Sequence, residues 1–303
     1  MKKVVIFGCQ QIAVDFIKFL IKRNDIKISL VITYELPLDK TYGYESVIEE
    51  FSNNKIEIIN PKSVNLTVLN KVKEINPDII FSIYYRKILP KSILNIPKLG
   101  CINIHPSLLP YYRGPVPTAW AIEKGEEKFG ITIHLMDEGI DTGNILIQEK
   151  FIIGKNETGY QLYTRAMKLG ASMLCENFDK IINNEIQSTP QKGNGSYYGK
   201  KNGKYTIDWK DSVHNIRNKI RVHAKPFNPA ETLLFNRYIL INEAQISNDK
   251  HPAQGCGVII GFKDKMPIIS CADGNLILKD FLIVPKLNKE EEKVYFKIGN
   301  KLG

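Results

Sequence analysis

The 303-residue sequence contains few cysteines, and those it has follow no recognisable pattern. The five thiols are odd in number, widely spaced and set mostly among apolar residues: Cys9, Cys101, Cys175, Cys256 and Cys271. Such spacing gives neither a disulfide framework nor a Cys-x-x-Cys metal site. We therefore expect buried, reduced thiols in a reducing compartment.

Long apolar runs are also missing. No stretch approaches the roughly 20 apolar residues that are needed to cross a bilayer. The apolar stretch near the start is interrupted by Gln10, Gln11 and Asp15, and it has no small-residue cleavage site of a secretory signal. The sequence thus predicts a soluble, cytoplasmic protein with no membrane partner.

A dense block of positive charge is absent, although the formal net charge is +10. The lysines are scattered singly among isoleucine and asparagine residues, and they form no visible stripe. An overall positive charge favours anionic partners in general, including phosphates. It does not single out nucleic acid, and we expect no nucleic-acid partner on this ground.

Apolar stretches of two different periods alternate along the first half of the chain. Stretches typical of strands are residues 2–8, 26–34, 56–61, 78–85, 101–105 and 130–136, and stretches typical of helices are 10–23, 44–54, 65–77 and 159–184. This alternation predicts an α/β domain with a parallel sheet covered by helices. Binding sites in such sheets lie beyond the carboxyl ends of the strands.

The composition changes between Ser188 and Lys204, where Gly, Lys, Ser and Gln replace aliphatic residues. Such a stretch is typical of a linker between domains. After it come short strand-like stretches at 237–246, 255–262, 267–272 and 275–284, which predict a small β-barrel or sandwich. The expected domains are therefore 1–190 and 204–303, with a linker at 191–203.

The stretch INIHPSLLPYYRG, residues 102–114, places polar side chains at the end of an apolar strand. Asn103 and His105 are two residues apart, so they point to the same side of that strand. An imidazole can move a proton near neutral pH, and an amide N–H can stabilise a developing oxyanion. The pair suits acyl transfer, although two polar residues that simply end a strand would give the same pattern.

An acidic cluster follows a second strand, in the stretch GITIHLMDEGIDTG at 130–143. Asp137, Glu138 and Asp141 could each set the tautomer and the pKa of His105 if the two strands are neighbours. A solvated turn is the plainer interpretation of these acids. His134 also lies nearby, but without further His or Cys ligands we expect no metal site.

These two motifs, with the spacing between them, resemble the signature of the folate-dependent formyltransferases. The resemblance implies a Rossmann-like N-terminal formyltransferase domain and places the family's catalytic Asn, His and Asp on Asn103, His105 and Asp141. It further implies that N10-formyltetrahydrofolate is the formyl donor and that a primary amine is the acceptor. A folate-binding protein that hydrolyses the formyl group, or only senses folate, is an alternative of a different class.

The resemblance also implies residues that contact the two substrates. The folate pocket would be lined by Arg86, Lys87, Ile88, Leu89, Met136, Asp137 and Gly139, largely through backbone groups. Ser107 would mainly cap or turn the loop, and contact with the acceptor would be its secondary role. Arg113 would meet a diphosphate with its planar guanidinium, or it would be a structural arginine at the end of the loop.

Residues 207–230 and the later DGNLIL are similar to the C-terminal β-barrel, OB-like, that tRNA and arabinose-type sugar formyltransferases share and the glycinamide ribonucleotide enzymes lack. The acceptor is indicated by two further resemblances. Residues 34–51, with one lysine and several acids, are similar to the loop of the UDP-4-amino-4-deoxy-L-arabinose formyltransferase domain, whereas the tRNA enzymes carry a basic, glycine-rich insertion there. Residues 78–90 are likewise similar to the corresponding strand and loop of that domain, and this segment is usually less aromatic in the tRNA enzymes. We therefore expect a UDP- or dTDP-linked amino sugar as acceptor, in lipopolysaccharide or O-antigen biosynthesis. The alternative is methionyl-tRNA, and a homodimer is left open.

Overall fold

The computed structural model describes residues 1–35, 39–200, 205–248 and 255–303. It divides into two compact units, each built from several segments. The first unit contains 1–117, 128–151 and 164–200, and the second contains 118–127, 152–163 and 201–303. Residues 201–203 of the expected linker lie outside the described residues, as do residues 36–38 of the 34–51 loop.

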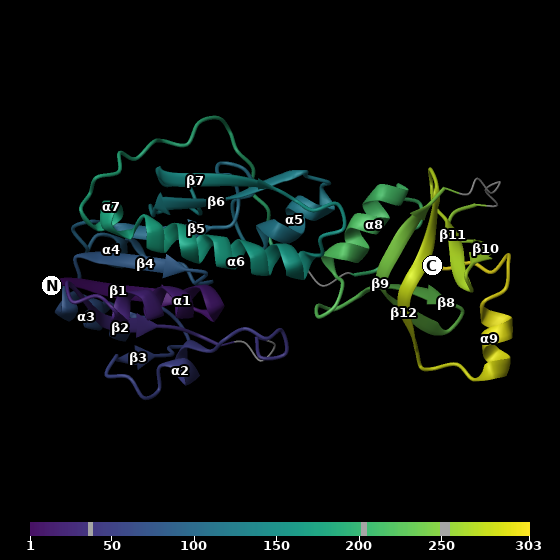
Figure 1. Cartoon of the computed structure of the whole chain (residues 1–303), viewed down its shortest axis with the longest axis horizontal. Coiled ribbons are helices and arrows are strands. Elements are labelled where there is room, and N and C mark those ends of the chain that lie inside the picture. Colours follow the sequence, from purple (N-terminus) through teal and green to yellow (C-terminus); the bar gives the residue numbers. More distant parts are fainter. Residues whose placement is uncertain (36–38, 201–204, 249–254) are drawn as a thin grey trace. The chain divides into compact units, whose positions relative to one another are not determined.

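The first unit is built on a seven-stranded sheet with the order β3-β2-β1-β4-β5-β6-β7, which Figure 1 shows edge to edge. The strands are β1 (Lys2–Gly8), β2 (Ile26–Ile32), β3 (Ile58–Ile59), β4 (Ile79–Ile83), β5 (Cys101–His105), β6 (Lys128–Leu135) and β7 (Ile145–Ile152). The pairs from β3 to β5 are all parallel. The expected α/β fold is confirmed, and β1 lies between β2 and β4, where the chain crosses to the other half of the sheet.

Strand β6 runs antiparallel to β5, with Asn103 opposite His134 and His105 opposite Thr132. The expectation of a wholly parallel sheet is wrong at this point. β6 is buried along most of its length, as a parallel strand would be. Its apolar, β-branched pattern therefore does not reveal the direction in which the strand runs. The loop that follows β6 therefore starts beside the amino end of β5, where the Met136 N–H donates to the Cys101 carbonyl.

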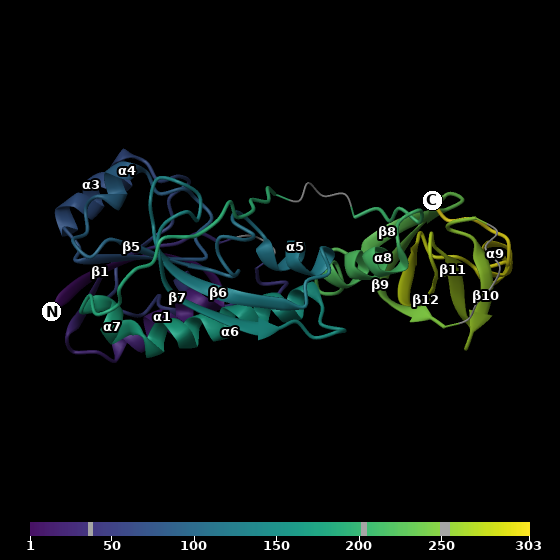
Figure 2. The same cartoon turned by 90° about the horizontal axis from the view of Figure 1, so that it is seen from above.

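Helices cover both faces of this sheet, as the view in Figure 2 shows. The helices of this region are α1 (Gln10–Ile21), α2 (Val47–Glu50), α3 (Leu66–Ile75), α4 (Lys91–Leu94), α6 (Gly159–Glu176) and α7 (Phe178–Ile182). Alternate side chains of a strand face opposite layers. Phe7 belongs to the apolar cluster that contains Val68 and Val72 of α3, while Phe81 contacts Phe16 of α1 on the other face.

Helix α6 is long but not strongly apolar, since Arg165 and Lys168 interrupt it. Gly170 brings it close to the sheet: a Cβ atom at this position would lie 3.0 Å from Ile104 Cδ1. Across the ranges that the structure describes, no helix is long and apolar enough to cross a membrane.

The second unit contains a five-stranded antiparallel sheet with the order β10-β11-β12-β9-β8. Its elements are α5 (Pro117–Glu123, from Thr118 onward), α8 (Val213–Val222), β8 (Ala230–Leu234), β9 (Arg237–Ser247), β10 (Ile259–Lys263), β11 (Met266–Ser270), β12 (Asn275–Val284) and α9 (Lys289–Tyr295). Ser212 caps α8, since its hydroxyl accepts the Asn215 N–H. The expected separate β domain is confirmed.

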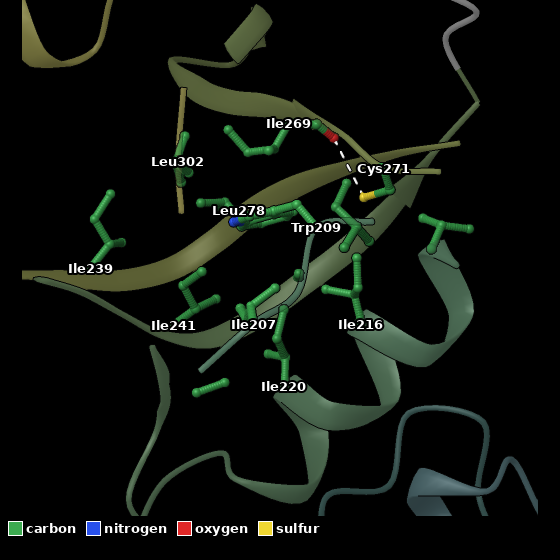
Figure 3. Packing of buried hydrophobic residues seen from close by; sticks show 14 of the residues in the cluster. Ile207, Trp209, Ile216, Ile220, Ile239, Ile241, Ile269, Cys271, Leu278 and Leu302 are labelled. Atoms are coloured by element: carbon green, nitrogen blue, oxygen red, sulfur yellow. Dashed lines mark hydrogen bonds between the residues drawn. The ribbon is translucent and has the colours of Figure 1, made fainter. Parts of the chain in front are cut away.

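The core of this unit lies between α8 and the concave face of the sheet, as Figure 3 shows. Ile216 and Ile220 of α8 contact a buried cluster that includes Trp209, whose indole N–H donates to Thr232 Oγ1 at 3.0 Å. The last residues pair with both edges of the sheet. Leu302 bridges to Leu234 at the end of β8, and Lys301 bridges to Val258 just before β10. These bridges close the sheet into a barrel.

Candidate active site

Strand β5 places Asn103 and His105 on one side of the sheet, as their spacing predicts. His105 is buried, and Asn103 is half-buried. The ring nitrogen Nε2 of His105 lies 2.9 Å from the carbonyl oxygen of Tyr112. Because a carbonyl oxygen can only accept, Nε2 carries the hydrogen, and Nδ1 is the nitrogen that can take up another proton.

Asp141 reaches this pair although its loop starts at the far end of β5. Residues 136–144 turn back along the sheet, and the Leu135 N–H donates to the Asn144 carbonyl at the neck of the turn. Asp141 Oδ2 lies 3.5 Å from His105 Nδ1, and Asp141 Oδ1 lies 3.4 Å from Asn103 Nδ2. The three predicted catalytic residues are therefore brought together, with the carboxylate facing the nitrogen of His105 that can be protonated.

The turn that delivers Asp141 is tight. Asp141 has a φ of 55°, in the left-handed region that non-glycine residues seldom occupy. Asp137 shapes the turn, since its Oδ1 accepts hydrogen bonds from the Gly139 N–H and the Thr142 hydroxyl. A Cβ atom at Gly143 would lie 1.8 Å from the Leu135 carbonyl oxygen, which excludes any larger residue there. The acidic cluster is thus a structured turn with one carboxylate turned to the histidine.

Gly114 holds that carboxylate from the opposite loop. Its backbone N–H donates to Asp141 Oδ2 at 2.8 Å. With a φ of 92°, Gly114 adopts a conformation that glycine reaches at no steric cost.

His134 fixes the amide of Asn103 in one orientation. The Nδ1 atom of His134 lies 2.8 Å from the Leu135 carbonyl oxygen, so Nδ1 carries the hydrogen and Nε2 has a free lone pair. Nε2 accepts from Asn103 Nδ2 at 3.0 Å. Burial lowers the pKa of His134 to about 4 and keeps the ring neutral. The amide oxygen of Asn103 is thereby turned away from His134, and its second N–H makes only the long contact to Asp141.

The loop after β5 is fixed by polar groups from β6 and β7. The Thr132 hydroxyl donates to the Ser107 carbonyl at 2.7 Å and accepts from Gln148 Nε2 at 2.8 Å. Ser107 is fully buried, and its hydroxyl donates to the Tyr111 carbonyl. Ser107 therefore turns the loop, and its contact with an acceptor stays a prediction.

Arg113 lies at the end of this loop and contacts Gln191. Its Nε and Nη2 atoms donate to Gln191 Oε1 at 3.1 and 2.7 Å. The guanidinium group carries five N–H donors, of which Gln191 takes two. The contact matches a structural arginine at a loop end, and the predicted contact with a diphosphate stays a prediction.

The two segments expected to contact folate, 86–89 and 136–139, lie close together. Met136 packs against the apolar cluster that contains Leu89 and Tyr85. Lys91, just after the first segment, forms an ion pair with Glu138 at 2.5 Å. Arg86 and Ile88 are exposed, as are Asp137 and Gly139, whereas Leu89 is buried. Leu89 thus acts in packing, and the exposed members form the accessible rim of this region.

Metal ligands do not gather in this region or elsewhere in the described ranges, where no group of three or more His, Cys, Asp or Glu side chains is arranged to hold a metal ion. His134 instead binds Asn103 and a backbone carbonyl. The amide, the imidazole and the carboxylate of the site can supply hydrogen bonds and proton transfer.

Comparison with protein families agrees with this site. Residues 2–178 match the formyl transferase family, and residues 200–292 match the formyl transferase C-terminal domain. The chain belongs to the formyl transferase family, and it is a formyltransferase enzyme.

Similar proteins include a polymyxin resistance protein, methionyl-tRNA formyltransferases and N-formyltransferases of known structure. The chain is 35% identical over 277 residues to the bifunctional polymyxin resistance protein ArnA of Wigglesworthia glossinidia brevipalpis, covering 90% of this chain but 42% of ArnA. It is 37% identical over 226 residues to the methionyl-tRNA formyltransferase of Alkaliphilus oremlandii, covering 72% of each. Among solved structures, the N-formyltransferase of Helicobacter canadensis, in complex with folinic acid and dTDP-3-aminofucose, is similar with a TM-score of 0.73 and 25% identity. That likeness covers 93% of this chain and 100% of the other.

Three residues with evident positions in the site were missed by reasoning from the sequence. His134 was weighed only as a metal ligand, although its strand position opposite Asn103 would have indicated a contact had the pairing been known. Gly114 bonds to Asp141 through its backbone, which leaves no signal in the sequence beyond a glycine. Gln191 lies in a stretch expected to be a linker, and nothing in its composition indicates a role.

Proposed function

We propose that this formyltransferase transfers a formyl group from N10-formyltetrahydrofolate to the primary amine of a nucleotide-linked amino sugar. The observation that supports formyl transfer is the convergence of Asn103, His105 and Asp141 at one end of β5. The observation that supports the sugar is the likeness, over nearly the whole chain, to an N-formyltransferase crystallised with a dTDP-amino sugar.

The residues present fit a folate beside this site. The ion pair between Glu138 and Lys91, which lies just after segment 86–89, links that segment to 136–139, and both segments include exposed residues. The second segment leads directly into Asp141. Residues of these two segments would hold the folate beside Asp141. N10-formyltetrahydrofolate would supply an activated formyl group. The residues of the chain would orient it, stabilise the developing charge and move the proton.

In the proposed mechanism, each catalytic residue acts through a stated atom. The second N–H of Asn103 turns from its long contact with Asp141 to the developing oxyanion of the formyl group. His105 takes the proton of the attacking amine on Nδ1, and the Tyr112 carbonyl holds the ring in place through Nε2–H. Asp141 faces the imidazolium that results, and His105 then returns the proton to the departing folate nitrogen. The bond from the amine nitrogen to the formyl carbon would replace the bond from that carbon to the folate nitrogen, which would leave with the proton from His105.

The alternative acceptor is methionyl-tRNA, because several similar proteins are named methionyl-tRNA formyltransferase. One feature of the sequence and one of the structure disfavour it. The segment after β2 carries Glu35, Asp39 and Glu45 with the single lysine Lys40. Lys40 forms an ion pair with Glu49, so its charge is partly compensated. This segment therefore offers little positive charge to an acceptor stem, although its residues 36–38 lie outside the described part of the chain.

The decisive experiment is an acceptor panel. Purified protein with N10-formyltetrahydrofolate is assayed against UDP-, dTDP- and GDP-linked amino sugars and against methionyl-tRNA. We expect one nucleotide sugar to be formylated with a kcat/KM at least about 100-fold above that of the tRNA. Efficient formylation of methionyl-tRNA with no turnover of any sugar would establish the alternative. Release of formate without an acceptor, at the rate of transfer, would instead identify a hydrolase.

A further inference from the structure

Residues 188–198 cross the site and contact both of the loops that carry catalytic groups. We propose that Gln191, within this 188–198 segment, is a positioning residue that holds the backbone of Asp141 in its reactive conformation. The inference rests on the proposed role of Asp141 in formyl transfer. It concerns a side chain outside both sequence motifs, in a stretch that the sequence indicated to be a linker.

The 188–198 segment is bonded along the loop that follows β5. The Arg113 N–H donates to the Ser196 carbonyl at 2.9 Å, and the Tyr198 N–H donates to the Arg113 carbonyl at 3.0 Å. The Tyr112 N–H donates to the Ser196 hydroxyl at 2.9 Å, and the rings of Tyr112 and Tyr198 stack with centroids 5.1 Å apart. The segment is therefore fixed against the loop that carries Gly114, and is no flexible connection at this point.

The backbone of the 188–198 segment and that of the loop after β5 approach so closely that two positions, Gly195 and Gly114, have no room for a side chain. A Cβ atom at Gly195 would lie 2.4 Å from the Pro110 carbonyl oxygen, and one at Gly114 would lie 2.5 Å from the Tyr198 carbonyl oxygen. The segment also pairs with the strand after the Asp141 turn, since Thr189 and Ile145 exchange two backbone hydrogen bonds of 2.8 Å. Gln191 thus lies between two points at which the segment is anchored.

The side chain of Gln191 joins the two loops. Its Nε2 atom donates to the carbonyl oxygens of Asp141 and Gly143, both at 2.8 Å. Its Oε1 atom accepts from Nε and Nη2 of Arg113. Both N–H groups and the oxygen of the amide are satisfied, so the group is saturated with partners that lie on two different loops.

Only one orientation of this amide is possible. Carbonyl oxygens only accept and a guanidinium group only donates, so the amide oxygen must face Arg113 and the amide nitrogen must face Asp141 and Gly143. A flipped amide would bring oxygen against two carbonyl oxygens and N–H groups against N–H groups. Arg113 therefore sets the orientation of Gln191, and Gln191 in turn holds the carbonyls on either side of Thr142.

These bonds matter because Asp141 is in a strained conformation. A left-handed φ costs a non-glycine residue free energy, and it persists only where neighbouring contacts impose it. Gln191 restrains the backbone of Asp141 while the Gly114 N–H restrains its carboxylate. Loss of the first restraint would let the turn relax and carry the carboxylate away from His105, which is already at 3.5 Å.

The test separates the donor of Gln191 from its size. Gln191→Glu keeps the shape and the acceptor for Arg113 but removes both N–H donors, and Gln191→Met removes donor and acceptor together. We expect each to lower kcat by about 10- to 100-fold, with KM for folate and acceptor within about threefold of wild type. The matched control is Gln187→Glu, the same change at an exposed position just before the segment, which should leave kcat unchanged. A kcat of Gln191→Glu within about threefold of wild type would overturn the proposal.

A double-mutant cycle distinguishes positioning from a general structural effect. If Gln191 acts through Asp141, then Gln191→Glu in an Asp141→Asn background should lower the remaining kcat by less than about threefold. An undiminished 10- to 100-fold effect there would contradict the proposal. If Asp141→Asn alone keeps full activity, the proposed role of Asp141 fails, whatever the result at Gln191.

Arg113 provides a second test should the Gln191 variants not fold. Arg113→Met leaves Gln191 in place but removes the groups that orient its amide, so we expect kcat to fall by about 10-fold. A rise in the KM of the nucleotide sugar with kcat unchanged would assign Arg113 to the diphosphate alone and overturn its part in positioning.

Discussion

Gly114 and Asp141 are joined by a backbone hydrogen bond of 2.8 Å, although they lie 27 residues apart and on different loops. The bond sets the distance between the loop that ends β5 and the turn that follows β6. The same carboxylate oxygen faces Nδ1 of His105. The position of the carboxylate is therefore determined by two loops, and each is fixed by contacts of its own.

Replacement of Gly114 by alanine should disturb this arrangement. The added Cβ atom would meet the Tyr198 carbonyl at 2.5 Å and the Tyr197 ring at 2.7 Å, in a conformation that already disfavours alanine. We expect a loss of about 2–4 kcal/mol in the free energy of unfolding and a lower kcat. Gly193→Ala is the control, because Gly193 also has a positive φ but nothing lies within 4 Å of its Cβ. That variant should lose only about 1 kcal/mol and keep its kcat; equal losses in both would show that backbone conformation alone matters.

Asp141→Asn should lower kcat by about 100-fold or more, because the charge that faces imidazolium is removed while the shape is kept. The comparison is Glu149→Gln on β7. Glu149 is exposed and has no part in the proposed mechanism, so this variant should keep its kcat within about threefold. Steady-state kinetics with both substrates saturating measures the effect. Full activity in Asp141→Asn would exclude Asp141 as the carboxylate of the mechanism.

His134 predicts a dependence of stability on pH. Burial lowers its pKa in the folded chain to about 4, below the ordinary histidine value of about 6.5. The unfolded chain therefore binds more protons between these values, and the free energy of unfolding should fall as the pH falls through this range. The contribution of His134 is up to about 3 kcal/mol.

The measurement is urea unfolding of wild type and His134→Gln at pH 7 and pH 5. Glutamine can accept from Asn103 through its side-chain oxygen, and it does not titrate. Groups remote from the site change protonation alike in both proteins, so the difference between the two curves reports His134 together with Asp141 and His105, the charged groups that interact with it. The wild type should lose more stability than the variant on going to pH 5. Parallel curves would show that His134 does not bind a proton on unfolding.

Salt dependence should separate a nucleotide sugar from tRNA. Binding of tRNA would neutralise several phosphates and release counterions, so its affinity would fall steeply between about 50 and 200 mM salt. A diphosphate offers few charges, and contacts at short range are screened less. We expect the KM of the sugar to rise by less than about fivefold over this range. A rise of 100-fold or more, measured with the acceptor that the enzyme prefers, would contradict a sugar substrate.

Much of the first unit could be predicted because its strands and helices have clear periods. Phe16 at helical spacing and Phe7 in an apolar strand both lie in the cores their patterns indicate. The direction of β6 could not be predicted, since Ile131 and Ile133 would be buried in either direction. Strands β7 and β8 were missed as well, because β7 exposes Gln148, Glu149 and Lys150 in succession and shows no alternation.

The members of the site differ in how far the sequence reveals them. Asn103 and His105 are neighbours in one strand, so local geometry alone puts them together. Asp141 meets them only through a turn that folds back along β5, and the prediction placed it there by assuming a parallel strand. The structure brings Asp141 beside His105 as predicted, but along a path other than the one assumed. Gln191 depends on tertiary pairing with two loops, which no local pattern encodes.

The bridges of Leu302 and Lys301 in the second unit have a consequence for association between chains. An edge strand presents backbone donors and acceptors in a row, and a strand of another molecule can pair with them. Here residues 299–303 of the same chain occupy such positions beside both β8 and β10. The barrel thus covers these parts of its edges itself, which disfavours growth of the sheet by addition of strands from a second molecule.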